Sequence, residues 1–156
     1  MPKIDISKVP VQNGAGRYPK QFCAPLDGRE KQALGNAAGL TQFGVNLTRL
    51  KPGAVSALRH WHEQEDEFVY ILEGELALIE DEGETLLRAG EAAGFQASVA
   101  NGHHLVNRSQ RDAIFLVVGT RTPEDRVHYS DHDLVYDYDG TSFTFTHKSG
   151  EPYSEE

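Results

Sequence analysis

The chain is poor in cysteine, in long apolar runs and in positive charge, and each shortage argues against a class of protein. Cys23 is the single cysteine among 156 residues, so no disulfide can form within the chain and a reducing compartment is compatible with it. No run approaches the ~20 apolar residues of a membrane span, and the N-terminal stretch lacks the apolar core of a signal peptide. We therefore expect a cytoplasmic protein that spans no membrane.

The charge balance argues against a nucleic-acid partner. The formal net charge is -9, whereas binding to a phosphate backbone requires a basic surface. The sequence also contains no G-x-S-x-G, P-loop or G-x-G-x-x-G pattern, so it gives no support to serine-based catalysis or nucleotide binding.

Short alternating or apolar runs separated by Gly, Pro, Asn and Asp fill the middle of the chain. These runs cover residues 41–50, 55–62, 67–73, 75–80, 84–88, 91–95, 103–107 and 114–119. Such closely spaced short strands, with no helical period between them, predict an all-β sandwich or barrel. We assign this barrel to residues 40–120.

The two flanks differ from the middle. Residues 1–39 form a proline-containing N-terminal arm with little expected structure, apart from a short helix or turn within residues 29–39. Residues 121–156 form an acidic C-terminal extension in which 143–146 alternate like an edge strand. The sequence leaves open whether this extension packs on the barrel or on a partner subunit.

His60 and His62 are the most informative pair of residues. Two side chains at positions i and i+2 of a strand point to the same face, so both imidazoles can bind one metal ion. Glu67 and His103 are candidates for the remaining ligands. Three neutral imidazoles, one carboxylate and a divalent ion sum to +1, which suits an anionic or oxygen-rich ligand. Octahedral coordination would leave about two positions open.

The spacing around these residues resembles the two motifs of the cupin superfamily. The first motif, G-x5-H-x-H-x(3,4)-E-x6-G, matches from His60 to Gly74, with one extra residue after Gly53. The second, G-x5-P-x-G-x2-H-x3-N, is matched more loosely by residues 90–107. There, Gln96 and Ser98 replace the usual proline and glycine, and the segment before the histidine is longer.

The resemblance is to single-domain bacterial cupins, and it implies a double-stranded β-helix, or jelly-roll barrel, with a metal ion inside. It carries over His60, His62, Glu67 and His103 as ligands of a divalent metal, with Zn, Mn, Fe and Ni all open. The H-x3-N spacing favours His103 over the adjacent His104.

Several polar residues are candidates for contact with a small-molecule ligand: Gln42, Asn46, Gln96 and His104. The acidic residues Glu63, Glu65 and Asp66 either support the ligand histidines or form a solvated turn. No general base is identifiable, although His104, Glu65 and Tyr70 are candidates.

Three functions are compatible with this site. The first is a mononuclear metal enzyme that acts on a small oxygen-rich or carboxylate-bearing metabolite by isomerase, lyase or dioxygenase chemistry. The second is a protein that binds a sugar or another small molecule without turnover. The third is a metal-free structural barrel. We also expect a homodimer, because an open jelly roll has strand edges that pairing can protect.

Overall fold

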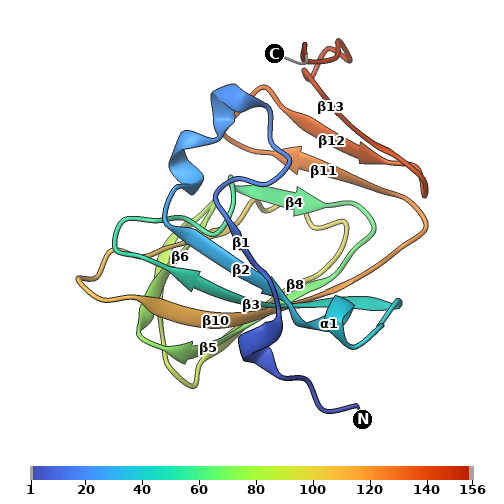
Figure 1. Ribbon diagram of the computed structural model, residues 1–156. Coiled ribbons are helices and arrows are strands. Elements are labelled where there is room, and N and C mark those ends of the chain that lie inside the picture. The colour runs from blue at the N-terminus through green and yellow to red at the C-terminus, as the bar shows by residue number, and fades with distance from the viewer. Residues whose placement is uncertain (1, 155–156) are drawn as a thin grey trace.

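The computed structural model describes residues 2–154, and within them nearly all regular structure is β (Figure 1). The strands are β1 (Val11–Asn13), β2 (Arg29–Ala33), β3 (Phe43–Leu50), β4 (His60–His62), β5 (Glu67–Glu73), β6 (Glu75–Glu80), β7 (Gly83–Arg88), β8 (Ala92–Phe95), β9 (His104–Val106), β10 (Ala113–Thr120), β11 (Asp125–Tyr129), β12 (Val135–Tyr138) and β13 (Phe143–Thr146). The helices are α1 (Leu34–Ala37) and the 3₁₀ turns η1 (Ile6–Lys8), η2 (Lys20–Phe22) and η3 (Ala24–Leu26). The predicted all-β class is confirmed. None of the described helices has the length and apolarity that a membrane span needs.

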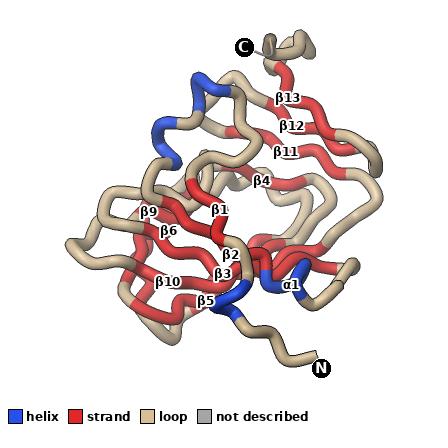
Figure 2. The backbone as a smooth tube through the Cα atoms, viewed as in Figure 1, coloured by secondary structure: helices blue, strands red, loops and turns tan. Residues whose placement is uncertain are grey.

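Three antiparallel sheets make up the barrel and its extension (Figure 2). The largest has the order β1-β2-β3-β10-β5-β8, the second β13-β12-β11-β4 and the third β7-β6-β9. Strands far apart in sequence therefore lie side by side: β10 pairs along its whole length with β3, and β11 pairs with β4.

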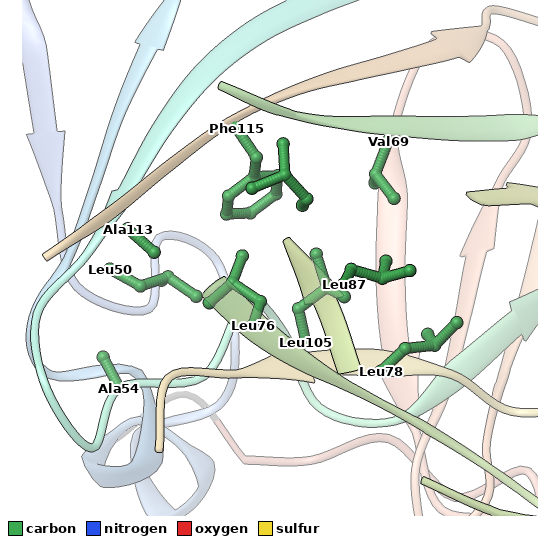
Figure 3. Close-up of a cluster of buried hydrophobic side chains, with 10 residues drawn as sticks. Leu50, Ala54, Val69, Leu76, Leu78, Leu87, Leu105, Ala113 and Phe115 are labelled. Atoms are coloured by element: carbon green, nitrogen blue, oxygen red, sulfur yellow. The ribbon is translucent and has the colours of Figure 1, made fainter. Parts of the chain in front are cut away.

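The barrel interior is filled by alternate residues of the large sheet and of the β6–β9 sheet. Leu50, Leu76 and Phe115 are almost completely buried in this cluster (Figure 3). Ile71 is fully buried in the same cluster. By the same alternation Phe68, Tyr70 and Leu72 point outward and are 39–45% exposed. The predicted strand at residues 67–73 thus has the expected inward and outward faces.

The flanks are more structured than the sequence indicated. The N-terminal arm contributes β1 and β2 to the large sheet, and the tail contributes β11, β12 and β13. A second buried cluster joins the two flanks, with Leu26 from the arm against Leu134 and Tyr129 from the tail. The predicted edge strand at residues 143–146 is β13, which lies at the edge of its sheet.

Candidate functional site

The two histidines of β4 face the barrel interior. β4 pairs with β11, placing His62 opposite Val127 and His60 opposite Tyr129, and His60 also forms an isolated bridge with His103. Trp61 lies between the two histidines in sequence and stacks on His128, with ring centroids 4.3 Å apart. Strand alternation therefore directs both imidazoles to one side and the indole ring to the other.

Glu67, the first residue of β5, is the centre of the cluster. Its Oε1 atom lies 3.0 Å from His62 Nε2 and 3.5 Å from His60 Nε2, and its Oε2 atom lies 2.6 Å from His103 Nε2. The structure thus brings together the four residues that the motif resemblance suggested as ligands, although they come from β4, β5 and the residue before β9.

The hydrogen bonds on the far sides of the rings define which nitrogen is free. His60 Nδ1 lies 2.7 Å from the carbonyl oxygen of Leu58, which can only accept, so Nδ1 carries the proton. His62 Nδ1 lies 2.7 Å from Asp125 Oδ2 and donates in the same way. In both rings Nε2 is therefore the atom directed at Glu67, which is the arrangement found in metal-ligating histidines.

This donor set fits a divalent metal ion. Ligand atoms of His60, His62 and Glu67 all lie within 4.8 Å of one another, and His103 Nε2 completes three nitrogens and one carboxylate. Imidazole and carboxylate together suit Zn, Mn, Fe and Ni. The cluster could thus hold a metal, whose identity the donor set leaves open.

The charges and hydrogen bonds within the cluster stabilise the ionised forms of Glu67 and His62. Burial on its own raises the pKa of Glu67, but the charge of His60 and the hydrogen bonds from His103, His60 and His62 outweigh it and hold this pKa well below its usual range. Burial lowers the pKa of His62, and the stronger combined effect of Asp125 and Glu67 raises this pKa to about 10. A metal ion that binds here must displace a proton from His62.

The cluster opens on a cavity of about 370 Å³ between the large sheet and the β4–β11–β12–β13 sheet. Its apolar walls include Val69, Phe95 and Phe115 from the large sheet and Phe145 from the tail. Its carboxylates are Glu65, Glu67 and Asp125, and its cations are Arg17, Arg29 and Lys31. The cavity is therefore mostly apolar with a few polar groups, as small-molecule sites usually are.

The candidate ligand-contact residues fall in different places. Asn46 and His104 line the cavity. His104 Nδ1 donates to the carbonyl oxygen of Ala57, and burial lowers the pKa of its ring. Gln96 instead borders a smaller pocket behind His62 and His103. Gln42 is exposed and lines neither pocket.

The three acidic residues of the turn before Glu67 have different partners. Glu65 lines the cavity, and its Oε1 atom accepts a hydrogen bond from the Thr122 amide. Glu63 Oε1 lies 2.7 Å from His128 Nε2, and Asp66 accepts from the Ala97 amide. Of these carboxylates, Glu65 is the one that faces the cavity.

Ser98 shows how the chain accommodates a departure from the second motif. It stands where glycine is usual, and it has a left-handed φ of 67°. Its amide donates to the carbonyl oxygen of His62 and its hydroxyl to that of Glu63. These two bonds offset the strain that a non-glycine residue has in this region, so the loop next to the ligands keeps a conformation that suits glycine.

Two groups of residues at this site were not found from the sequence. Asp125 follows Glu67 by almost 60 residues and reaches His62 only because β11 pairs with β4. Arg17 and Lys31 lie in the arm, outside the motif region, and no spacing pattern links them to the histidines. The only hint in the sequence is that residues 29–33 contain three charged side chains and no apolar alternation. In a strand of this composition, charged side chains must take some of the inward positions.

Comparisons with known proteins agree with this geometry. The Cupin domain family model matches residues 46–119. A crystal structure of a sugar phosphate isomerase of the cupin superfamily from Silicibacter pomeroyi is 47% identical, with a TM-score of 0.93, and the match covers 97% of this chain and 96% of that one.

More distant structures share the fold. A protein from Acidithiobacillus ferrooxidans, provisionally named a sugar phosphate isomerase, is 26% identical over 82% of this chain and 81% of that one, with a TM-score of 0.73. A predicted oxalate decarboxylase from Thermotoga maritima is 21% identical over 77% of this chain and 99% of that one, with a TM-score of 0.61, which shows the fold alone. No curated protein matches the sequence. The motif match, the barrel and the similarity along almost the entire chain together show that this protein belongs to the cupin superfamily.

Proposed function

We propose that the protein is a metal-dependent isomerase of a sugar phosphate. The observation that carries the proposal is the position of the His60, His62, Glu67 and His103 cluster, which opens on a cavity that also contains cationic side chains. The similarity to the Silicibacter pomeroyi sugar phosphate isomerase supports the same chemistry.

The four ligand residues would hold the metal at the inner end of the cavity. When bound, a divalent ion supplies Lewis-acid polarisation of neighbouring carbonyl and hydroxyl oxygens. Asp125 and the carbonyl oxygen of Leu58 fix the rings of His62 and His60, so the two Nε2 atoms are oriented before any ligand arrives. Phe95 stacks on His103 with ring centroids 3.6 Å apart and so holds the plane of that ring.

Isomerisation of an α-hydroxy carbonyl compound removes a proton from one carbon and returns a proton to its neighbour, while the carbonyl and hydroxyl positions exchange. We assign the proton transfer to Glu65. Asp125 is bonded to His62, and Glu67 is a ligand, so Glu65 is the remaining carboxylate of the cavity. Its Oε2 atom lies 3.8 Å from His62 Nδ1 and has no hydrogen bond to a described residue.

Burial supports this role because it raises the pKa of Glu65, against the opposing effect of the Thr122 amide. A carboxylate with a raised pKa is a better proton acceptor at neutral pH.

The metal is tested first, by elemental analysis of protein purified without added metal. We expect His103→Ala to lose most of the bound metal, because it removes one of four ligands. The adjacent His104→Ala is the matched control and should retain it, since the His104 ring is turned to the Ala57 carbonyl. Equal metal content in wild type and His103→Ala would contradict the four-ligand site.

Turnover is tested with a panel of aldose and ketose phosphates in deuterium oxide, followed by proton NMR. We expect interconversion of one pair with deuterium incorporation at the reacting carbon, and a fall of roughly 10²–10⁴-fold in kcat for Glu65→Gln. Glu63→Gln is the control, because Glu63 contacts His128 outside the cavity. Binding of a sugar phosphate without turnover would instead identify a binding protein.

We also propose that the protein is a homodimer formed through the outer face of the large sheet. Two rows of apolar side chains cross three strands there: Phe68, Val118 and Val45 in one row, and Tyr70, Leu116 and Leu47 in the next. The arm covers the β2 edge instead, so the exposed face is a stronger candidate for pairing than the strand edges considered from the sequence.

A further inference from the structure

Three cations line one wall of the cavity and have no carboxylate partner among residues 2–154. They are Arg17, Arg29 and Lys31. Ion pairs are made by six other cations of the described residues, for example Lys51 with Glu30 at 3.6 Å and Arg59 with Asp131. In a chain with a formal net charge of -9, three cations that line one cavity without a carboxylate counterion form a site suited to an anion.

Strand alternation on β2 places two of these cations inside. The pairing of β2 with β3 places Arg29 opposite Leu50 and Lys31 opposite Thr48. Leu50 and Thr48 are both buried. Glu30, between them, faces outward and pairs with Arg49 and Lys51. The cations and the carboxylate of this short strand are therefore on opposite faces, and the inward charge is left without a protein counterion.

Arg29 holds in place the cationic wall of the cavity, the side lined by Arg17, Arg29 and Lys31. Its guanidinium donates to the carbonyl oxygen of Gly14 at 2.8 and 3.1 Å and to that of Ser56 at 2.7 Å. These bonds tie the arm to the barrel and commit three of the donors of Arg29 to neutral acceptors. Its positive charge still acts on the cavity, but its role is to position the wall.

Lys31 and Arg17 are the two cations of the cavity that have no carbonyl or carboxylate acceptor among the described residues. Lys31 is half-buried, and its ammonium has no hydrogen bond to a described residue. Burial, and then the charges of Arg29 and Arg17, lower the pKa of Lys31, so an anion beside it would relieve an unfavourable charge. Arg17 lies at the rim, with its guanidinium 4.8 Å from the centre of the Phe143 ring.

The cationic wall and the ligand cluster face the same cavity from two sides. In the large sheet Lys31 and Glu67 are three strands apart, ~20 Å along the curved sheet between main chains, and their side chains reach inward from there. Tyr18 also lines the cavity, and its ring contacts Tyr129, which in turn contacts His60, with ring centroids 5.8 Å apart in each pair. A ligand that occupies both sides must carry an anionic group at one end and metal-binding oxygens at the other.

We propose that Lys31 and Arg17, on a wall held by Arg29, form the subsite for the phosphate of the substrate. The inference rests on the proposed isomerase and adds the residues that select a phosphorylated sugar over a free one. A phosphate monoester carries close to two negative charges near neutral pH, which matches two free cations better than a single carboxylate does.

The test is calorimetric titration with inorganic phosphate, on the protein as purified with its metal and again after chelation. The chelated sample separates phosphate held by the cationic wall from phosphate held by the metal. We expect the chelated wild type to bind phosphate, and Lys31→Met and Arg17→Met each to bind it at least about tenfold more weakly, because each removes a charged hydrogen-bond donor.

Lys51→Met is the matched control, since Lys51 pairs with Glu30 outside the cavity and should leave phosphate binding unchanged. Lys31→Met removes a charge repelled by its neighbours, so it should fold and retain wild-type metal content. The subsite is overturned by absence of phosphate binding in the chelated wild type, by undiminished binding in both cavity variants, or by an equal loss in the Lys51 control.

Turnover separates this inference from the isomerase proposal. If Lys31→Met raises the KM for the sugar phosphate and leaves kcat nearly unchanged, both stand. If phosphate binding depends on Lys31 and Arg17 but no sugar phosphate is isomerised, the subsite stands and the isomerase proposal falls. Equal kcat/KM for a sugar phosphate and its unphosphorylated sugar would overturn the subsite while leaving an isomerase.

Discussion

At the scale of single residues, each ligand imidazole depends on the group at its far nitrogen. His62 has the strongest such partner, because Asp125 is 6% exposed and its carboxylate lies 2.7 Å from Nδ1. The same carboxylate accepts the Gln64 amide, which ties it to the turn before Glu67. Asp125 is thus held from two directions and in turn fixes the ring of His62, whose Nε2 atom points to the candidate metal site.

This arrangement predicts the effect of Asp125→Asn. The amide keeps the size of the side chain but removes the charge that raises the basicity of His62, so we expect metal affinity to fall by about 10–100-fold. Competition with a chelator of known affinity measures this. Glu124→Gln, the exposed neighbour, is the control. Unchanged metal affinity in Asp125→Asn would show that His62 does not depend on this contact.

The four candidate ligands could be identified from the sequence because they fall in a short motif with fixed spacing. His60 and His62 need only strand alternation, and Glu67 needs only a turn of four residues. Asp125 and Lys31 could not be identified in this way. Their relation to the site depends on the pairing of β11 with β4 and of β2 with β3, and the register of such long-range pairs is not encoded locally.

At the scale of elements, a strand such as β5 is recognisable in the sequence where apolar inward positions alternate with outward ones. β5 alternates Val69 and Ile71 with exposed residues and ends at Glu73, just before Gly74. β2 was missed because its inward positions are Arg29 and Lys31, which remove the apolar alternation that marks a strand. Arg29 and Lys31 also belong to the cationic wall of the cavity. The inward charges that conceal this strand in the sequence are therefore the charges on which the proposed phosphate subsite depends.

The two glycines of the first motif are predicted to differ in how well they tolerate substitution by alanine. Gly74 and Gly53 both have positive φ, 78° and 86°. A Cβ atom at Gly74 would lie 2.8 Å from the Asp112 carbonyl oxygen, whereas nothing lies within 4 Å at Gly53. We expect Gly53→Ala to cost about 1 kcal/mol from backbone strain alone and Gly74→Ala to cost clearly more. Urea denaturation of both variants measures this, and equal losses would contradict the role of the steric contact.

The turn between β12 and β13 carries a predicted pH dependence. The amides of Ser142 and Thr141 donate to Asp139 Oδ1, and they lower the pKa of Asp139 from 3.8 to about 2. Because the folded-state pKa is the lower one, the stabilisation is present above the unfolded-state pKa and is lost as pH falls through the folded-state value. We therefore expect Asp139→Ala to lower Tm at about pH 7 and to differ less from wild type at about pH 3. A Tm difference that stays constant over this range would contradict the assignment.

At the scale of the whole molecule, the arm and the tail change what the barrel can do. The arm supplies β1, β2 and the cationic wall, and the tail supplies β11 and with it Asp125. The Cupin family model covers residues 46–119 and so contains the four ligands but neither of these additions. The 47% identical relative matches 97% of the chain, flanks included. The four candidate metal ligands thus lie within the barrel, whereas Asp125 and the cations of the cavity come from the flanks.

The outer face of the large sheet gives the prediction for assembly. Tyr70 is 39% exposed and stands at the β5 end of one apolar row, so a charge there should prevent a second copy from packing without disturbing the barrel interior. We expect light scattering at micromolar concentration to give twice the mass of one chain for the wild type and the mass of one chain for Tyr70→Glu. Leu86→Glu is the control, because Leu86 is 41% exposed but lies on β7 in another sheet. A monomeric wild type would exclude the homodimer, and a dimeric Tyr70→Glu would place its interface elsewhere than on this face.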